Sequence, residues 1–188
     1  MFKILLALIV VFLGFCAGCP TRTGLTDATI TAPVGYVCPP RNITVGIHPQ
    51  FTAHERFLIG MAVNDLKHLN VFGRVVEGES DIVIRHWTFN CETLILGSYT
   101  SETNYALVDP RCSTTDQQFR AVVVHELGHW LGMRHVCRPD GKTTDVCSPV
   151  GRGEAVMNPN TSVNQVSIPN RLDIAEYNRV CWIRARGW

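Results

Sequence analysis

Three histidines and a glutamate lie close together in residues 125–135, which read His-Glu-Leu-Gly-His-Trp-Leu-Gly-Met-Arg-His. His125 and His129 are four residues apart, so on a helix both rings project from one face, about one turn apart. Two imidazoles placed in this way can share one zinc ion. Glu126 follows the first histidine, where its carboxylate can reach a water molecule on the metal without binding the metal itself. The spacing predicts a metal centre with a general base beside it.

The residues that follow predict a third ligand. Gly132 can adopt positive φ at little cost, so it can end the helix and turn the chain back toward the metal. His135 then becomes the third ligand, and one zinc ion is the expected cofactor. Three neutral donors with one open position are typical of a catalytic zinc site, because structural sites are closed by four protein ligands.

Apolar periodicity and turn residues indicate the elements that must position these side chains. Helices are expected over residues 51–69, 116–132 and 169–180. Strands are expected over residues 42–47, 72–76 and 81–87, with short edge strands over 94–96 and 104–108. Thr115 and Gln118 form a capping box for the second helix, and Ser167 can cap the third. Strands and one helix, then a helix, a long loop and a closing helix predict an α+β fold.

The motif H-E-x-x-H-x-x-G-x-x-H with a later methionine turn resembles that of the metzincin zinc peptidases. Residues 155–158, Ala-Val-Met-Asn, are the expected Met-turn, in which Met157 lies beneath the histidines as an apolar floor. The resemblance covers residues 42 to about 180 and implies a metzincin-type catalytic domain. Such a domain has a twisted mixed β-sheet, two long helices, and a C-terminal subdomain of loop with a final helix. A matrixin-like member is favoured, because residues 80–84 are similar to a matrixin strand.

The chain departs from several metzincin subfamilies at individual positions. Pro159 stands where astacin-like and serralysin-like members have a tyrosine. Val136 stands where reprolysin-like chains have aspartate and matrixins usually have serine. The cysteine switch of matrixins is not recognisable in residues 38–41. The subfamily therefore stays open.

Two rival metal schemes also remain. Glu154 can be placed in the role of the downstream glutamate ligand of gluzincins, although the residues around it have no helical signal. Cys137 can bind zinc, but it would close the position that catalysis needs. Whether the protein binds calcium is left open, because no recognised calcium-binding pattern is present.

The resemblance implies a zinc metalloendopeptidase that acts on peptides or proteins. A water molecule on the zinc would attack the peptide carbonyl while Glu126 takes its proton and then delivers it to the leaving amine. The substrate would pair with an edge strand, for which residues 104–108 are the candidate. An inert metzincin-fold binding lipoprotein is one alternative, although the retained Glu126 argues against it. A zinc-dependent amidase on a non-protein substrate would use the same residues.

The N-terminus has the features of a signal peptide over residues 1–18, with an apolar run at 4–15. This run is too short to span a bilayer, which takes roughly 18–20 residues. Residues 16–19, Cys-Ala-Gly-Cys, resemble the bacterial lipobox, so Cys19 is the expected lipidation site, with plain secretion as the alternative. We expect an exported bacterial protein, either a cell-envelope lipoprotein or secreted.

Composition narrows the partners of the mature chain. Residues 19–40 are rich in Thr, Gly and Pro and are expected to be a tether, followed by the peptidase domain over 41–188. The 17 basic residues include Lys3 of the signal and face 16 acidic ones, so the mature chain is formally neutral. A formally neutral chain gives no electrostatic reason to expect binding to nucleic acid. The expected membrane contact is the lipid anchor alone. A monomer is favoured, without the oligomeric state being determined.

Loss of Cys16 with the signal and lipidation of Cys19 would leave an even set of cysteines. Many pairings of this set are possible. The simplest pairs are Cys137 with Cys147, Cys91 with Cys112, and Cys38 with Cys181.

Overall fold

The computed structural model describes residues 31–93, 96–136, 155–157 and 167–187. Several predictions concern residues outside these ranges. They are the signal peptide with Cys19, most of the tether, the Cys137–Cys147 pair, Glu154, and the last residue of the Met-turn. Among the described residues, no helix is long and apolar enough to cross a membrane.

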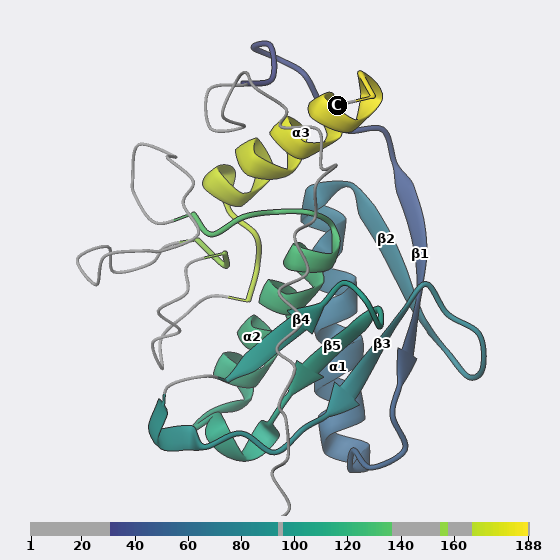
Figure 1. The fold of residues 1–188 in the computed structure, drawn as a ribbon, viewed down its shortest axis with the longest axis vertical. Coiled ribbons are helices and arrows are strands. Elements are labelled where there is room, and N and C mark those ends of the chain that lie inside the picture. Colours follow the sequence, from purple (N-terminus) through teal and green to yellow (C-terminus); the bar gives the residue numbers. More distant parts are fainter. Residues whose placement is uncertain (1–30, 94–95, 137–154, 158–166, 188) are drawn as a thin grey trace, which may run out of the picture.

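A mixed sheet and three α-helices make up the described fold (Figure 1). In chain order, with η marking 3₁₀ helices, the elements are β1 (Arg41–Ile47), α1 (Ala53–Asp65), η2 (Leu66–Leu69), β2 (Val71–Val76), β3 (Ile82–His86), η3 (Cys91–Thr93), β4 (Gly97–Thr100), β5 (Tyr105–Val108), η4 (Pro110–Cys112), α2 (Asp116–Trp130) and α3 (Arg171–Ala185). This composition confirms the predicted α+β class. Figure 1 shows α1 and α2 on one face of the sheet and α3 beyond its end.

The sheet has the strand order β2-β1-β3-β5-β4. The four strands β2, β1, β3 and β5 are parallel to one another. β4 runs antiparallel to β5. The prediction that residues 104–108 form an edge strand is therefore wrong, because β5 pairs with β3 on one side and with β4 on the other. Among the described strands, β2 and β4 take the two edge positions, and β4 covers Gly97–Thr100. The strand predicted over 94–96 falls mostly outside the described residues.

The core lies between the sheet and the first two helices. On β1, Ile43 and Val45 are buried and face this core, while α1 contributes Leu58, Ile59 and Ala62. α2 is enclosed far more completely, since its residues from 118 to 128 are buried except for residue 120. A helix surrounded in this way is held rigidly by packing on several sides, which suits an element that carries a catalytic site.

The helix ends differ in detail from the predictions. The segment expected as one helix over 51–69 divides, because α1 ends at Asp65 and a 3₁₀ turn follows. The third helix is capped by Asn170, not by Ser167 as predicted, and it continues to Ala185. The Asn170 side chain accepts hydrogen bonds from two backbone N–H groups of the first turn, and Asp173 accepts one from the Asn170 N–H in return. This reciprocal capping box stabilises the helix start at residue 171.

Two disulfides join distant parts of the chain. Cys38–Cys181 links the segment before β1 to α3, and Cys91–Cys112 links η3 to η4. Both are pairs expected from the sequence. They fix the start of the sheet to the last helix and the segment before β4 to the segment before α2.

Candidate metal centre

The three predicted ligands converge in the structure. The Nε2 atom of His129 lies 3.0 Å from Nε2 of His125 and 3.1 Å from Nε2 of His135. The remaining Nε2–Nε2 distance, between His125 and His135, is 3.2 Å. Zinc–nitrogen bonds of about 2.0–2.1 Å in a tetrahedron separate the nitrogens by roughly 3.3 Å. The three side chains are thus arranged around one point at close to the spacing that a zinc ion requires.

The other ring nitrogens are oriented by the backbone. His125 Nδ1 lies 2.8 Å from the Val156 carbonyl oxygen, and His129 Nδ1 lies 3.0 Å from that of Met133. A carbonyl can only accept, so each Nδ1 donates its proton and each Nε2 keeps the lone pair that binds metal. Burial, with a smaller contribution from the neighbouring imidazoles, lowers the pKa of His125 to about 3. Burial likewise lowers the pKa of His129 to about 4, so both rings are neutral ligands at neutral pH.

Glu126 is positioned by the buried part of α2. It is 4% exposed, and burial raises the pKa of its carboxyl to about 8. Within the part of the chain that the structure describes, its Oε2 atom has no hydrogen-bond partner. A buried acceptor without a donor is costly, and a water molecule would supply the donor. The orphaned oxygen and the three-histidine donor set together fit a zinc centre with a water molecule beside it.

The described part of the Met-turn, residues 155–157, packs under this centre. Its three residues are buried, and Met157 is 1% exposed. A Cβ atom on Gly128 would collide with the Met157 sulfur, so this glycine of α2 makes room for the methionine between the turns that carry two of the ligands. The Val136 N–H donates to the Met157 carbonyl at 2.9 Å, which joins the turn to the residue after the third ligand.

Gly132 ends the active-site helix as the sequence predicts. Its φ is +90°, in the left-handed region that favours glycine. The Met133 N–H then donates back to the Gly128 carbonyl at 2.9 Å. A Cβ atom here would also lie 2.5 Å from Nη2 of Arg184, because α3 packs against the turn. The backbone conformation therefore favours glycine, whereas the Arg184 side chain is flexible and could move away from an added Cβ atom.

Two carboxylates of α3 hold the loops around the metal centre, and the sequence analysis missed them. Asp173 is fully buried and accepts hydrogen bonds from the N–H groups of Val156 and Met157, each at 3.0 Å. Burial raises its pKa, against the lowering effect of these backbone donors. Glu176 accepts from the Arg134 N–H at 3.1 Å and pairs with Arg179 at 2.7 Å.

A signal for these carboxylates was present. Asp173 and Glu176 are three residues apart on a helix, and so share one face. What that face contacts is a tertiary fact, however, and no local pattern predicts it.

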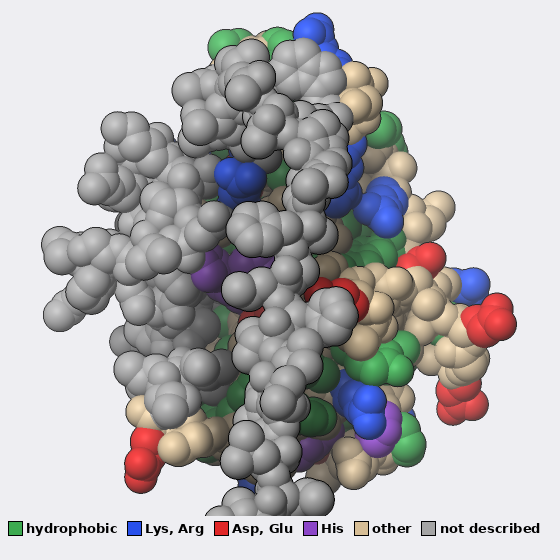
Figure 2. All heavy atoms as spheres, in the orientation of Figure 1, with side chains coloured by type: hydrophobic (Ala, Val, Ile, Leu, Met, Phe, Trp, Pro, Cys, Tyr) green, Lys and Arg blue, Asp and Glu red, His purple; other side chains and the backbone are tan. Residues whose placement is uncertain are grey.

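The centre lies partly open to solvent. His129 and His135 are half-buried, whereas His125 is buried. Histidine side chains are visible in Figure 2 on the side of the molecule where α2 lies.

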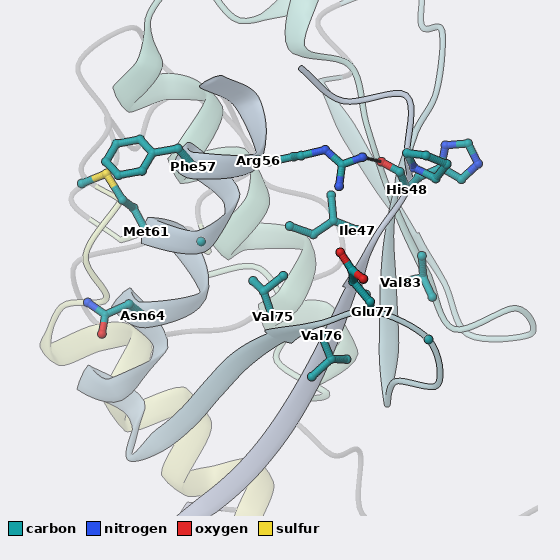
Figure 3. A pocket seen from close by; sticks show the side chains of 14 residues that line it. Ile47, His48, Arg56, Phe57, Met61, Asn64, Val75, Val76, Glu77 and Val83 are labelled. Atoms are coloured by element: carbon teal, nitrogen blue, oxygen red, sulfur yellow. Dashed lines mark hydrogen bonds between the residues drawn. The ribbon is translucent and has the colours of Figure 1, made fainter. Parts of the chain in front are cut away.

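A separate cavity of about 870 Å³ is lined by α1 and by the ends of β1 and β2 (Figure 3). Its lining is mainly apolar and includes Ile47, Met61 and Val75, with Arg56 and Glu77 as charged groups. None of the three histidines nor Glu126 belongs to this lining. This cavity is therefore distinct from the candidate metal centre.

Residues 93–182 match a family model described as "Metallo-peptidase family M12B Reprolysin-like". The match supports a metzincin-type zinc peptidase. The matched segment contains all three histidines, Glu126 and Met157. The matched model is reprolysin-like, so the matrixin-like subfamily favoured by the sequence analysis is not confirmed.

Several solved structures resemble the chain at low identity. A structure of myroilysin is 16% identical and covers 81% of this chain and 97% of its own, with a TM-score of 0.48. Archaemetzincin from Methanopyrus kandleri is 14% identical, with 79% and 97% covered and a TM-score of 0.48. High choriolytic enzyme 1, a hatching-enzyme zinc-protease from Oryzias latipes, is 14% identical, with 74% and 88% covered and a TM-score of 0.48. Similarities at this level assign neither a subfamily nor a substrate. No curated protein sequence matches the chain.

Proposed function

We propose that this protein is a zinc-dependent endopeptidase in which His125, His129 and His135 bind one zinc ion and Glu126 is the general base. The convergence of the three Nε2 atoms to within 3.0–3.2 Å of one another is the observation that carries the proposal. The match of this segment to a metallopeptidase family model supports it further.

Each residue of the centre has a separate role. Bound zinc would supply Lewis-acid polarisation of the scissile carbonyl and a lowered pKa for water. The bound cation would favour the charged carboxylate of Glu126, against the burial that raises its pKa to about 8. Glu126 then takes the proton of the attacking water and passes it to the departing amine. Its buried Oε2 atom has no hydrogen-bond partner among the described residues, which supports this role, because the atom can accept a hydrogen bond from water without first giving up such a partner. The Val156 carbonyl orients the first ligand, and the buried Met157 packs close to Gly128, between the first two ligands in the sequence.

The substrate is proposed to lie along β4. This strand is at the edge of the described sheet and packs against the active-site helix. An extended peptide can pair with the backbone of an exposed edge strand, which places its scissile bond across the metal centre. β4 thus takes the role that the sequence analysis gave to residues 104–108.

The purified mature protein, loaded with zinc, should cleave members of a broad peptide library. We expect cleavage to be lost on chelation and to fall at least about a hundredfold in Glu126→Gln, because the general base is removed while its size is kept. Glu79→Gln, at an exposed glutamate between β2 and β3, is the matched control and should cleave like the wild type. Metal analysis must show zinc bound to both variants.

The library also separates the alternatives. If the wild type binds zinc stoichiometrically and cleaves no peptide, the endopeptidase proposal is wrong. A binding protein or an amidase would then account for the centre. Full activity of Glu126→Gln would instead contradict the assignment of the general base alone.

The finer assignments remain proposals as well. The matrixin-like subfamily rests on the similarity of residues 80–84, and an experimental structure that includes residues 137–154 and 158–166 would test it. Export is supported by the disulfides, which persist in oxidising compartments. Lipidation of Cys19 rests on the lipobox-like residues 16–19. The mass of the mature N-terminus from a bacterial membrane fraction distinguishes a lipidated Cys19 from plain secretion.

A further inference from the structure

The first residue of β4 lies directly against the proposed general base. Gly97 pairs with Val108 of β5 and begins the edge strand. A Cβ atom on Gly97 would lie 2.6 Å from Oε1 and 2.8 Å from Cγ of Glu126, and 2.9 Å from Cγ1 of Val122. Cβ atoms essentially never approach other atoms so closely. Any larger residue at position 97 would therefore have to displace a neighbour.

Backbone conformation does not account for this glycine. The described glycines with positive φ are Gly35, Gly78, Gly132 and Gly187. Gly97 is not among them, so other residue types could adopt its backbone conformation. The position requires a residue without a side chain, because Glu126 occupies the space that a side chain would fill.

Packing determines where the Glu126 carboxylate lies. The side chain is buried, yet its Oε2 atom has no hydrogen-bond partner among the described residues. The Glu126 side chain lies against Gly97, next to Val122 of the previous turn of α2, since a Cβ atom at position 97 would meet both residues. A carboxylate that is positioned by packing, and not by hydrogen bonds to both of its oxygens, shifts when a neighbouring group is displaced or enlarged.

We propose that Gly97 is a positioning residue for the general base, and that its lack of a side chain keeps the Glu126 carboxylate in its working position. This inference rests on the proposed peptidase function. Val122 belongs to a buried, rigid stretch of helix, so an added methyl group at position 97 displaces the flexible Glu126 side chain instead. A misplacement of about 1 Å in a reacting group can cost on the order of a hundredfold in rate.

Gly97→Ala tests this directly. We expect kcat to fall by about tenfold to a hundredfold, with KM nearly unchanged because the backbone groups of β4 still pair with substrate. Zinc content should match that of the wild type. Gly60→Ala is the control: Gly60 lies in α1 with nothing within 4 Å of an added Cβ, so its kcat should not change. A rise in KM alone, or unchanged kcat, overturns the proposal.

A double-mutant cycle adds a readout that a merely structural role would not move. Glu126→Asp shortens the base by one methylene and frees space beside position 97. The loss caused by Gly97→Ala should therefore be several-fold smaller in the Glu126→Asp background than in the wild type. If the losses in kcat of the two single variants simply multiply in the double variant, Gly97 does not act through Glu126. If Gly97→Ala alone does not fold, its combination with Val122→Ala, which removes the 2.9 Å contact, is measured in its place.

Crystal structures of the wild type and of Gly97→Ala separate this inference from the proposed function. A displaced Glu126 carboxylate supports positioning by Gly97 whether or not the wild type cleaves peptides. A carboxylate that stays in place overturns it. An inactive, zinc-loaded wild type, by contrast, overturns the peptidase function alone.

Discussion

At the scale of single residues, the candidate centre depends on groups that are kept uncharged by burial. His125 is enclosed by α2 and the Met-turn, and its Nδ1 is paired with the Val156 carbonyl. Protonation of this ring would place a charge in a desolvated site beside two further imidazoles. The same burial that prepares the ring to bind metal therefore makes the metal-free protein sensitive to acid.

The metal-free protein should lose stability as the pH falls, because His125 is buried in its neutral form. The pKa of His125 is about 3 in the folded state, against an ordinary value near 6.5. A depressed folded-state pKa means that the unfolded chain binds more protons in this range. The contribution to stability is thus complete above about pH 6.5 and is lost as the pH falls toward 3.

Denaturant unfolding of the chelated protein between pH 7 and pH 4 measures this effect. The free energy of unfolding should fall less steeply with decreasing pH in His125→Gln than in the wild type. His68→Gln, at an exposed position in η2, is the control and should keep the wild-type slope. Equal slopes for His125→Gln and the wild type would show that the buried imidazole is not a source of the acid sensitivity.

At the scale of elements, α3 acts as a clamp on the segments that leave α2. Asp173 holds the backbone of the Met-turn, and Glu176 holds the backbone just before the third ligand. α2 itself supplies two ligands and the base from residues 125–129. The third ligand and the apolar floor therefore depend on α3 for their positions, although α3 contributes no ligand.

Asp173→Asn is expected to weaken both stability and zinc binding. Asparagine keeps the size but lacks one of the two acceptor oxygens, so a buried N–H of Val156 or Met157 loses its partner. An unsatisfied buried donor costs about 1–3 kcal/mol, and loss of such supporting groups typically weakens metal affinity by about 10–100-fold. Denaturant unfolding and competition with a chromogenic chelator measure the two effects. Asp116→Asn, at an exposed carboxylate of α2, should change neither by much; comparable losses in both variants would argue against the clamp.

At the scale of the whole molecule, the two disulfides close loops of very different size. Cys38–Cys181 spans 143 residues and connects the start of the sheet to α3. Cys91–Cys112 spans 21 residues on the side of the molecule that leads into β4 and α2. The longer link constrains the unfolded chain more, and it also fixes the helix that clamps the Met-turn.

Replacing both cysteines of the long link by serine should lower the free energy of unfolding by about 2–5 kcal/mol. The equivalent change at Cys91 and Cys112 should cost less, because the closed loop is shorter. Equilibrium unfolding in denaturant compares the two double variants. A larger loss from the short link would indicate that native-state packing, rather than chain entropy, dominates the effect of these disulfides.

Local features of the candidate centre could be predicted from the sequence alone. The ligand spacing, the helix that carries it and the turn at Gly132 depend on interactions within a few residues, and the structure shows these features in place. The pairs Cys38–Cys181 and Cys91–Cys112 were the simplest of many possible pairings, and the structure contains both. Element ends were less accurate, since Ser167 and Asn170 are both good caps and the choice between them depends on the reciprocal bond to Asp173.

Three features depend on the tertiary structure. They are the place of β4 at an edge of the sheet, the contacts of α3, and the space that favours glycine at position 97. Strand order depends on pairing between segments far apart in the sequence, so 97–100 and 104–108 cannot be ranked from their own residues. Asp173 meets the Met-turn, and Gly97 meets Glu126, only after the chain has folded. The sequence by itself thus determined the groups that carry the chemistry, because their spacing is local. The surroundings that orient those groups were decided by long-range packing, which no local pattern encodes.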